Sequence, residues 1–336
     1  MQQWLKGLVG NMSHTLLAHP EPQIHLFLSR VEDELARMAA TASGILGELA
    51  GHIFAAGGKR LRPRLVILGA GPAPPAPEAV VDVAVAAELI HTASLVHDDV
   101  IDNANTRRGR VTVNERWGNR IAVLAGDFLF ARAFDLLARH QHYGVVELMT
   151  GAIAAMCQGE IEQAGSLFDC NITEDAYLAR IRKKTACLFG ACCRAGAALS
   201  AGAPPLLRHF YAFGVELGLA FQITDDILDL SADPVSLGKP VGNDLAQGVL
   251  TLPVIRALQD DYYGPRLRRA IERRRLTPAE LDLVREALEV TGALTYAYQV
   301  AAGHLAAARR HLEAIPDGPR RQMLLDLAEK ILARKR

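Results

Sequence analysis

The chain has 336 residues, of which half are hydrophobic, so it can bury a large core. Lysine plus arginine and aspartate plus glutamate number 37 each, which removes any general argument for nucleic acid or an anionic membrane surface as a partner. The five cysteines show no paired zinc spacing, which favours reduced thiols in a cytoplasmic protein. We expect neither a signal peptide nor a membrane anchor, since the most apolar segment, 79–96, contains Asp82, Glu88 and His91.

Apolar residues recur at three- and four-residue spacing along most of the chain, and alternating β-branched runs are almost absent. The pattern predicts an all-α protein. The predicted helices are 24–57, 62–70, 79–103, 111–115, 119–140, 143–165, 173–201, 206–230, 249–259, 261–273, 278–291, 293–314 and 318–334. The predicted breaks, rich in Pro, Gly or Asp, are 71–77, 103–110, 201–205, 231–248 and 316–319. Thr277, Pro278 and Glu280 form a capping-box pattern at one helix start.

The predicted helices 79–103, 143–165 and 206–230 are apolar on nearly all sides. Helices of this kind lie in the middle of a large bundle, where every face contacts protein. Since no linker divides the chain, we expect one all-α domain over residues 1–336, built around a central cavity.

One acidic motif occurs twice, each time at the C-terminal end of an apolar predicted helix. The six acids are Asp98, Asp99 and Asp102 in DDVID, and Asp225, Asp226 and Asp229 in DDILD. Residues four apart share a helix face, so each motif presents a carboxylate pair. Exposed helix ends would explain such residues only poorly, because a helix C-terminus already carries partial negative charge. The repetition favours ligands for a hard divalent cation such as Mg²⁺, shared with a substrate phosphate.

Basic residues stand near both motifs and in a glycine-rich segment. They are Lys59, Arg62, Arg107, Arg108, Lys184 and Lys239. Any one of them alone is usually a solvated surface residue. Two glycines before Lys59 allow close backbone approach, however, and metal ions together with basic side chains describe a site for one or more diphosphates.

Six segments of the chain are similar, in order and spacing, to motifs of one enzyme family. They are GGKRLRP, HTASLVHDDVIDNANTRRG, GDFLFARAF, KKTACLF, FQITDDILD and GKPVGNDLAQGVLTLP. Over about residues 45–260 the chain resembles the trans-prenyltransferases of the polyprenyl diphosphate synthase family. The resemblance implies the isoprenoid-synthase helical bundle and Mg²⁺-dependent elongation of an allylic diphosphate, such as farnesyl diphosphate, with isopentenyl diphosphate. Loss of the allylic diphosphate leaves a carbocation, which the double bond of isopentenyl diphosphate attacks before a proton leaves.

The resemblance also implies roles for single residues. Mg²⁺ ions bridging the allylic diphosphate are held by Asp98, Asp102 and Asp225, with Asp99, Asp226 and Asp229 supporting. The allylic diphosphate is contacted by Arg107, Lys184, Thr185, Gln222 and Lys239. Isopentenyl diphosphate is contacted by Gly58, Lys59, Arg62, His91 and Arg108. His97 has no role in this assignment and is expected to be a packed neighbour.

The product chain is expected to grow along the helix that carries the first acids. Ala93 and Ser94 lie five and four residues before Asp98, roughly 6 to 7.5 Å up the helix. Relatives with short products tend to have aromatic residues there, so these small residues favour a heptaprenyl or octaprenyl product for a quinone such as menaquinone. Close helix packing alone would also explain the two small residues. Candidates for the floor of the tunnel are Phe134, Met149 and Met156.

Val249 departs from the family pattern, because many relatives have a lysine there. Some heptaprenyl-type synthases work with a small dissimilar subunit, so we expect a homodimer or such a heterodimer. A shorter-chain farnesyl or geranylgeranyl diphosphate synthase is the main alternative. A terpene cyclase would replace DDILD with an Asn/Ser/Glu pattern, and a non-catalytic subunit would have lost an acidic cluster or the pair Arg107 and Arg108.

Overall fold

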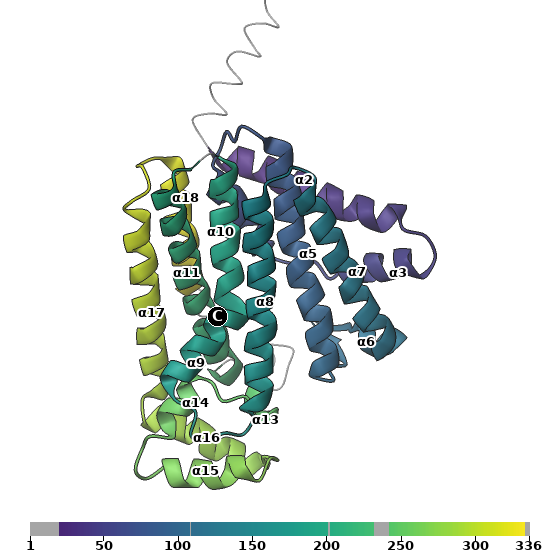
Figure 1. The fold of residues 1–336 in the computed structure, drawn as a ribbon. Coiled ribbons are helices and arrows are strands. Elements are labelled where there is room, and N and C mark those ends of the chain that lie inside the picture. The colour runs from purple at the N-terminus through teal and green to yellow at the C-terminus, as the bar shows by residue number, and fades with distance from the viewer. Residues whose placement is uncertain (1–19, 108, 201, 232–241, 333–336) are drawn as a thin grey trace, which may run out of the picture. The chain divides into compact units, whose positions relative to one another are not determined.

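The computed structural model describes residues 20–107, 109–200, 202–231 and 242–332, which are helical almost throughout (Figure 1). The predicted all-α class is confirmed. The chain forms two compact units. The first contains the described residues of Met1–Thr150, Ala191–Tyr211 and Ala314–Leu324, and the second those of Gly151–Gly190, Ala212–Glu313 and Leu325–Arg336. The single-domain organisation stays a prediction.

The first unit is built around α5 (Pro77–Ile101), whose Val and Ala side chains are buried along most of its length. It packs against four helices: α2 (Pro20–Thr41), α4 (Leu61–Ala70), α6 (Val113–Trp117) and α7 (Asn119–Ala138). Next to α2 lies α3 (Ile45–Phe54). A hairpin of β1 (Thr106–Arg107) and β2 (Arg110–Val111) follows the end of α5. The first acidic cluster therefore sits at the end of a rigid central helix.

The polar residues Asp82, Glu88 and His91 predict that segment 79–96 is not a membrane span. By length and hydropathy, however, α5 is long and apolar enough to cross a membrane. Of its most apolar window, 72% is buried inside the protein. That degree of burial is typical of a helix in a protein core.

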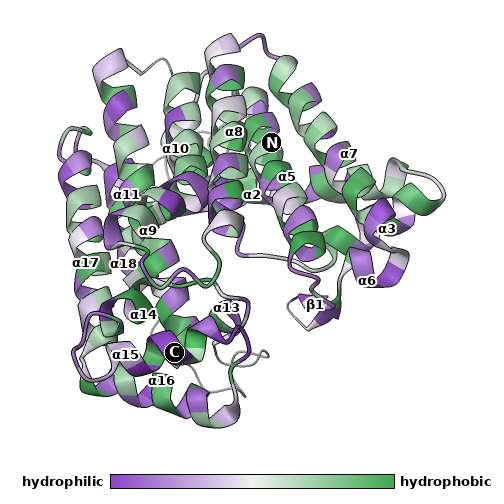
Figure 2. Ribbon diagram, turned by 60° about the horizontal axis from the view of Figure 1, so that its bottom comes forward, coloured by the Kyte–Doolittle hydropathy of each residue, from purple (hydrophilic) through white to green (hydrophobic). Residues whose placement is uncertain are grey.

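The second unit contains α9 (Glu174–Ile181), which is followed by a π-helical turn, η1 (Arg182–Ala186). Five further helices belong to it: α13 (Asn243–Ala246), α14 (Leu252–Ala257), α15 (Gly264–Glu272), α16 (Pro278–Val290) and α17 (Ala293–Leu312). Leu267, Ala270 and Ile271 of α15 are buried, whereas Arg266 and Arg269 are exposed. Figure 2 shows hydrophilic (purple) and hydrophobic (green) residues interspersed along the helices. The capping box of Thr277 and Glu280 is confirmed at the start of α16.

Four helices contribute residues to both units: α8 (Tyr143–Gly165), α10 (Cys187–Leu199), α11 (Pro204–Ser231) and α18 (Pro319–Leu332). The chain thus passes between the units inside these four helices, and once more between Glu313 and Ala314, after α17 has ended. The predicted bounds of α8 are reproduced.

Several predicted helix bounds are wrong for local reasons. The helix predicted over 24–57 is two helices, because the chain turns at Gly44 with a φ of 59°, a conformation that glycine adopts at little cost. The helix predicted from 111 begins at Val113, since Val111 pairs in β2. The helix predicted over 173–201 contains the π-helical turn. The helix predicted over 249–259 is limited to α14, and α13 forms inside the predicted 231–248 loop.

Candidate active site

The first acidic cluster occupies the last turn of α5. The backbone N–H of Asp102 donates to the carbonyl oxygen of Asp98 at 2.8 Å, so the two residues stand one helical turn apart. Asp98 is half-buried and Asp102 exposed, whereas Asp99 is buried. The predicted pair of carboxylates on one face is therefore present.

Arg107 reaches back from β1 to the acidic cluster. Its Nε donates to Oδ1 of Asp99 at 2.7 Å, and the Asp99 side chain is 7% exposed. The hairpin that carries Arg107 is held by Thr112, whose hydroxyl donates to the carbonyl oxygen of Ala104 at 2.7 Å. The predicted closeness of arginine and acids is thus a direct ion pair with the buried acid.

Arg60 is a residue of this region that the sequence analysis missed. It stands between the two predicted substrate contacts Lys59 and Arg62, in a left-handed conformation at the start of α4. Its guanidinium pairs with Oε1 of Glu88 at 2.9 Å on α5, and with Glu32 on α2. A glutamate within the apolar run 79–96 could have signalled this partner, because a buried charge requires one.

One pocket gathers several of the predicted residues in the first unit. His91, Asp99 and Arg107 line it, together with Gly57 and Arg60 from the glycine-rich segment. Its lining omits Gly58, Lys59, Arg62, Asp98 and Asp102. It also omits the chain-length residues Ala93 and Ser94 and the floor candidates Phe134 and Met149. His91 also accepts, through its carbonyl oxygen, a hydrogen bond from Ser94 Oγ at 2.9 Å.

The two proposed chain-length residues differ in environment. Ala93 is fully buried, and Ser94 is half-buried. Of the candidate floor residues, Phe134 is 38% exposed and Met149 fully buried, while Met156 is half-buried. His97 packs against α7, with Nε2 3.0 Å from the carbonyl oxygen of Val123, as expected of a packed neighbour.

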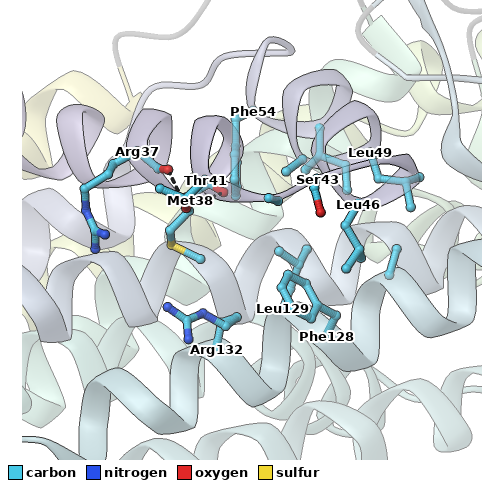
Figure 3. A pocket seen from close by; sticks show the side chains of 14 residues that line it. Arg37, Met38, Thr41, Ser43, Leu46, Leu49, Phe54, Phe128, Leu129 and Arg132 are labelled. Carbon is cyan, nitrogen blue, oxygen red and sulfur yellow. Dashed lines mark hydrogen bonds between the residues drawn. The ribbon is translucent and has the colours of Figure 1, made fainter.

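A second cavity of the first unit, about 390 Å³, lies between α2, α3 and α7 (Figure 3). Its walls include Met38, Leu49 and Phe128, with Arg37 and Arg132 at one end. Both arginines already pair with acids of their own helices, Glu34 and Asp135. None of the predicted site residues that the structure describes lines this cavity, so we assign it no part in the chemistry.

In the second unit the π-helical turn η1 carries the predicted pair Lys184 and Thr185. Lys184 Nζ lies 2.6 Å from Oε2 of Glu160 on α8. Gly159 allows the two backbones to approach, because a Cβ there would stand 2.8 Å from the Lys184 nitrogen. π-Helical turns are frequent at functional sites, since they redirect side chains that a regular helix would spread around its axis.

The second acidic cluster divides between two faces of α11. Asp225 and Asp229 are half-buried and one turn apart, whereas Asp226 is 4% exposed. Gln222 Nε2 donates to Oδ1 of Asp226 at 2.7 Å, and Thr185 Oγ1 donates to Oε1 of Gln222 at 2.8 Å. Three predicted site residues are thereby joined in one chain of hydrogen bonds.

The Asp226 carboxyl has a strongly shifted pKa. Burial, with the negative charge of Asp244 beside it, raises the pKa of Asp226 to about 8. Hydrogen bonds from Tyr177 and Gln222 oppose this shift. Burial likewise lowers the pKa of Arg180, whose guanidinium donates to the carbonyl oxygen of Leu250 at 2.8 Å. Tyr177 and Arg180 were missed by the sequence analysis.

The segment after the second cluster returns to α11. The backbone N–H of Asp244 lies 3.3 Å from Oδ2 of Asp229, and the N–H of Val249 donates to the carbonyl oxygen of Asp244 at 2.9 Å. Val249 is buried. The predicted contacts Lys239 and Arg108 lie outside the described residues.

The carboxylates fit Mg²⁺ in their chemistry. Within the described ranges, no group of three or more His, Cys, Asp or Glu gathers closely enough to hold a metal by itself. Mg²⁺ is commonly bound by one or two carboxylates while substrate phosphates and water supply the remaining ligands. The pairs Asp98 with Asp102 and Asp225 with Asp229 offer that number of oxygen donors.

The all-α scaffold carries paired carboxylates near the ends of α5 and α11, and Arg107 pairs with Asp99. These features are the ones expected of an enzyme of the isoprenoid class that acts on diphosphates. The family model described as polyprenyl synthetase matches residues 43–289. Heptaprenyl diphosphate synthase component 2 of Geobacillus stearothermophilus is 43% identical over 304 residues, 90% of this chain and 93% of that protein. A short chain isoprenyl diphosphate synthase of Methanothermobacter thermautotrophicus is 38% identical over 84% of this chain and 89% of that protein.

Among solved structures, a decaprenyl diphosphate synthase from Rhodobacter capsulatus superposes with a TM-score of 0.87 at 35% identity, covering 94% of this chain and 98% of that one. The chain belongs to the polyprenyl synthetase family. It is a trans-prenyltransferase, an enzyme that makes polyprenyl diphosphates.

Proposed function

We propose that this enzyme extends an allylic diphosphate with isopentenyl diphosphate, in a Mg²⁺-dependent reaction, to a long-chain all-trans product of the heptaprenyl or octaprenyl class. The pair of acidic clusters on α5 and α11 carries the proposal. The heptaprenyl name of the relative at 43% identity supports the product class, as do the small residues Ala93 and Ser94.

In this proposal Asp98, Asp102, Asp225 and Asp229 would hold the metal ions, and the bound metal would supply positive charge for the leaving diphosphate. Arg107 and Lys184 bind phosphate oxygens directly. Lys184 is held by Glu160 in this structure, so an anionic substrate has to compete with that carboxylate.

The chemical step breaks the allylic C–O bond, and its electron pair leaves with diphosphate. The double bond of isopentenyl diphosphate then forms the new C–C bond to the allylic carbon. A proton leaves the adjacent carbon for the departing diphosphate and regenerates a double bond, so the product is allylic again. Arg107 and Lys184 are positioned before the bond breaks, so they stabilise the negative charge that develops on the leaving diphosphate. Apolar walls keep water from the carbocation.

We further propose that the chain works with a small second subunit or as a homodimer, in the cytoplasm, in the supply of a quinone side chain such as that of menaquinone. The name "component 2" of the relative at 43% identity supports a second subunit. Val249 supports it too, because a buried valine supplies no cation where the family pattern has lysine.

The test is an assay with farnesyl and isopentenyl diphosphates and Mg²⁺, on the purified chain alone and then with cell extract added. We expect Asp98→Ala and Asp225→Ala to lower turnover by at least about a hundredfold with an unchanged circular dichroism spectrum. Asp135→Ala, at an exposed pair with Arg139, is the matched control and should leave turnover unchanged.

Near-normal turnover of either cluster variant would reject the metal assignment. A product distribution ending at geranylgeranyl diphosphate would support the shorter-chain alternative. No elongation under either condition would support a non-catalytic subunit.

A further inference from the structure

Tyr177 on α9 is fully buried, yet its hydroxyl forms a hydrogen bond with a carboxyl group of the second acidic cluster. The hydroxyl donates to Oδ2 of Asp226 at 2.6 Å. The nearest of the six family segments, KKTACLF, begins at Lys183, and none of the six contains this tyrosine. A phenylalanine would fill the same space, so the hydroxyl requires its own explanation.

The second oxygen of Asp226 is also engaged, because Gln222 donates to Oδ1 at 2.7 Å. Gln222 in turn accepts from the Thr185 hydroxyl at 2.8 Å. With a donor on each oxygen, the plane of the Asp226 carboxyl is fixed. This network ties α9 and the π-helical turn to α11.

Arg180 lies near the Tyr177 ring. Its guanidinium lies 5.7 Å from the centre of the Tyr177 ring, and it is 3% exposed. It is anchored by the carbonyl oxygen of Leu250 at 2.8 Å and by Ser166 Oγ at 3.2 Å. The buried Arg180 guanidinium near the ring and the Asp226 carboxyl bonded to the hydroxyl leave the Tyr177 hydroxyl little freedom to move.

Helix geometry separates this network from the proposed metal-facing acids. Gln222 and Asp226 are four residues apart and form one stripe of α11, while Asp225 and Asp229 form the next. In the first stripe Asp226 is buried and bonds to the buried Tyr177, whereas Asp225 and Asp229 of the second stripe are half-buried. The rotation of α11 that presents Asp225 and Asp229 is therefore set by what Asp226 contacts.

We propose that Tyr177 is a positioning residue: its hydroxyl anchors Asp226, and through Asp226 it fixes the turn of α11 that presents Asp225 and Asp229 to the Mg²⁺–diphosphate. This inference rests on the proposed function. It makes Asp226 an anchor on the buried face of α11.

The test is Tyr177→Phe, which removes only the hydroxyl oxygen. In metal-free protein, we expect faster hydrogen exchange of the backbone amides of residues 222–230. With substrates, we expect the Mg²⁺ concentration for half-maximal rate to rise about two- to tenfold, as for loss of one buried hydrogen bond, with KM for isopentenyl diphosphate unchanged. Tyr296→Phe is the matched control, because that hydroxyl donates to Glu174 in the same unit at 2.8 Å, and it should change neither readout.

Unchanged exchange, or an unchanged Mg²⁺ requirement in an active Tyr177→Phe enzyme, overturns the inference. A loss of thermal stability with neither change does so too, since it shows a structural role only. If Tyr177→Phe does not fold, Asp226→Asn weakens the same bond, and unchanged exchange of 222–230 in that variant overturns the inference equally. The exchange comparison needs no substrate, so it separates this inference from the proposed function, which fails if the wild-type enzyme elongates nothing with Mg²⁺.

Discussion

Ala93 and Ser94 are neighbours on α5 but differ in the room around them. Ala93 is fully buried, so a phenylalanine there must displace packed neighbours, and we expect a loss of about 1–3 kcal/mol in the free energy of unfolding. Ser94 is half-buried, so Ser94→Phe should fold normally and shorten the main product. Urea unfolding and chromatography of the extracted products test both expectations. A full-length product from folded Ser94→Phe would remove this position from length control.

The raised pKa of Asp226 predicts a pH-dependent stability in metal-free buffer. Its carboxyl has a pKa of about 8 in the folded chain, against 3.8 ordinarily, because it is buried and lies near Asp244. Between these values the folded state keeps a proton that the unfolded state has lost, so this group lowers the free energy of unfolding as pH rises. Below pH 3.8 the Asp226 carboxyl makes its full favourable contribution to the free energy of unfolding, and above pH 8 that contribution is lost completely.

Asp226→Asn removes this titration. Relative to wild type, we expect the free energy of unfolding of the variant to rise by up to about 1.4 kcal/mol per pH unit between pH 5 and 8. Urea unfolding at pH 5, 6.5 and 8 gives the three differences. A difference that stays constant across this range would contradict the assigned cause.

The π-helical turn η1 and α8 form a contact that two glycines of α8 can test. In Gly159→Ala the new Cβ would lie 2.8 Å from the Lys184 backbone nitrogen. Backbone cannot yield at low cost, so we expect a loss of about 1–3 kcal/mol and lower turnover, because Lys184 and Thr185 move with the turn. Gly151→Ala meets nothing within 4 Å and should raise stability by up to about 1 kcal/mol. Thermal unfolding and turnover are measured for both variants. Equal effects of Gly159→Ala and Gly151→Ala on stability would contradict the contact between α8 and η1.

The helices could be predicted from the sequence because apolar periodicity and Pro or Gly breaks are local signals. The π-helical turn could not, because its residues RKKTA fit a regular helix and only packing against Gly159 distinguishes it. In the site, the repeated acids lie near the ends of α5 and α11, as the sequence predicts, and their role in metal binding stays a prediction. The partners of those acids were missed: Tyr177 meets Asp226 across 49 residues, and no local spacing encodes such a contact.

The division into two units raises the question of whether they unfold separately. Four helices, α8, α10, α11 and α18, contribute residues to both units. Melting one unit exposes part of each shared helix, and helix formation is cooperative along its length, so we expect the other unit to be destabilised with it. The prediction is one thermal transition with a calorimetric enthalpy equal to the van't Hoff enthalpy, which also tests the expected single domain. Two resolved transitions in scanning calorimetry would show that the units are independent domains, and Gly159→Ala, placed in the second unit, would then lower only one of them.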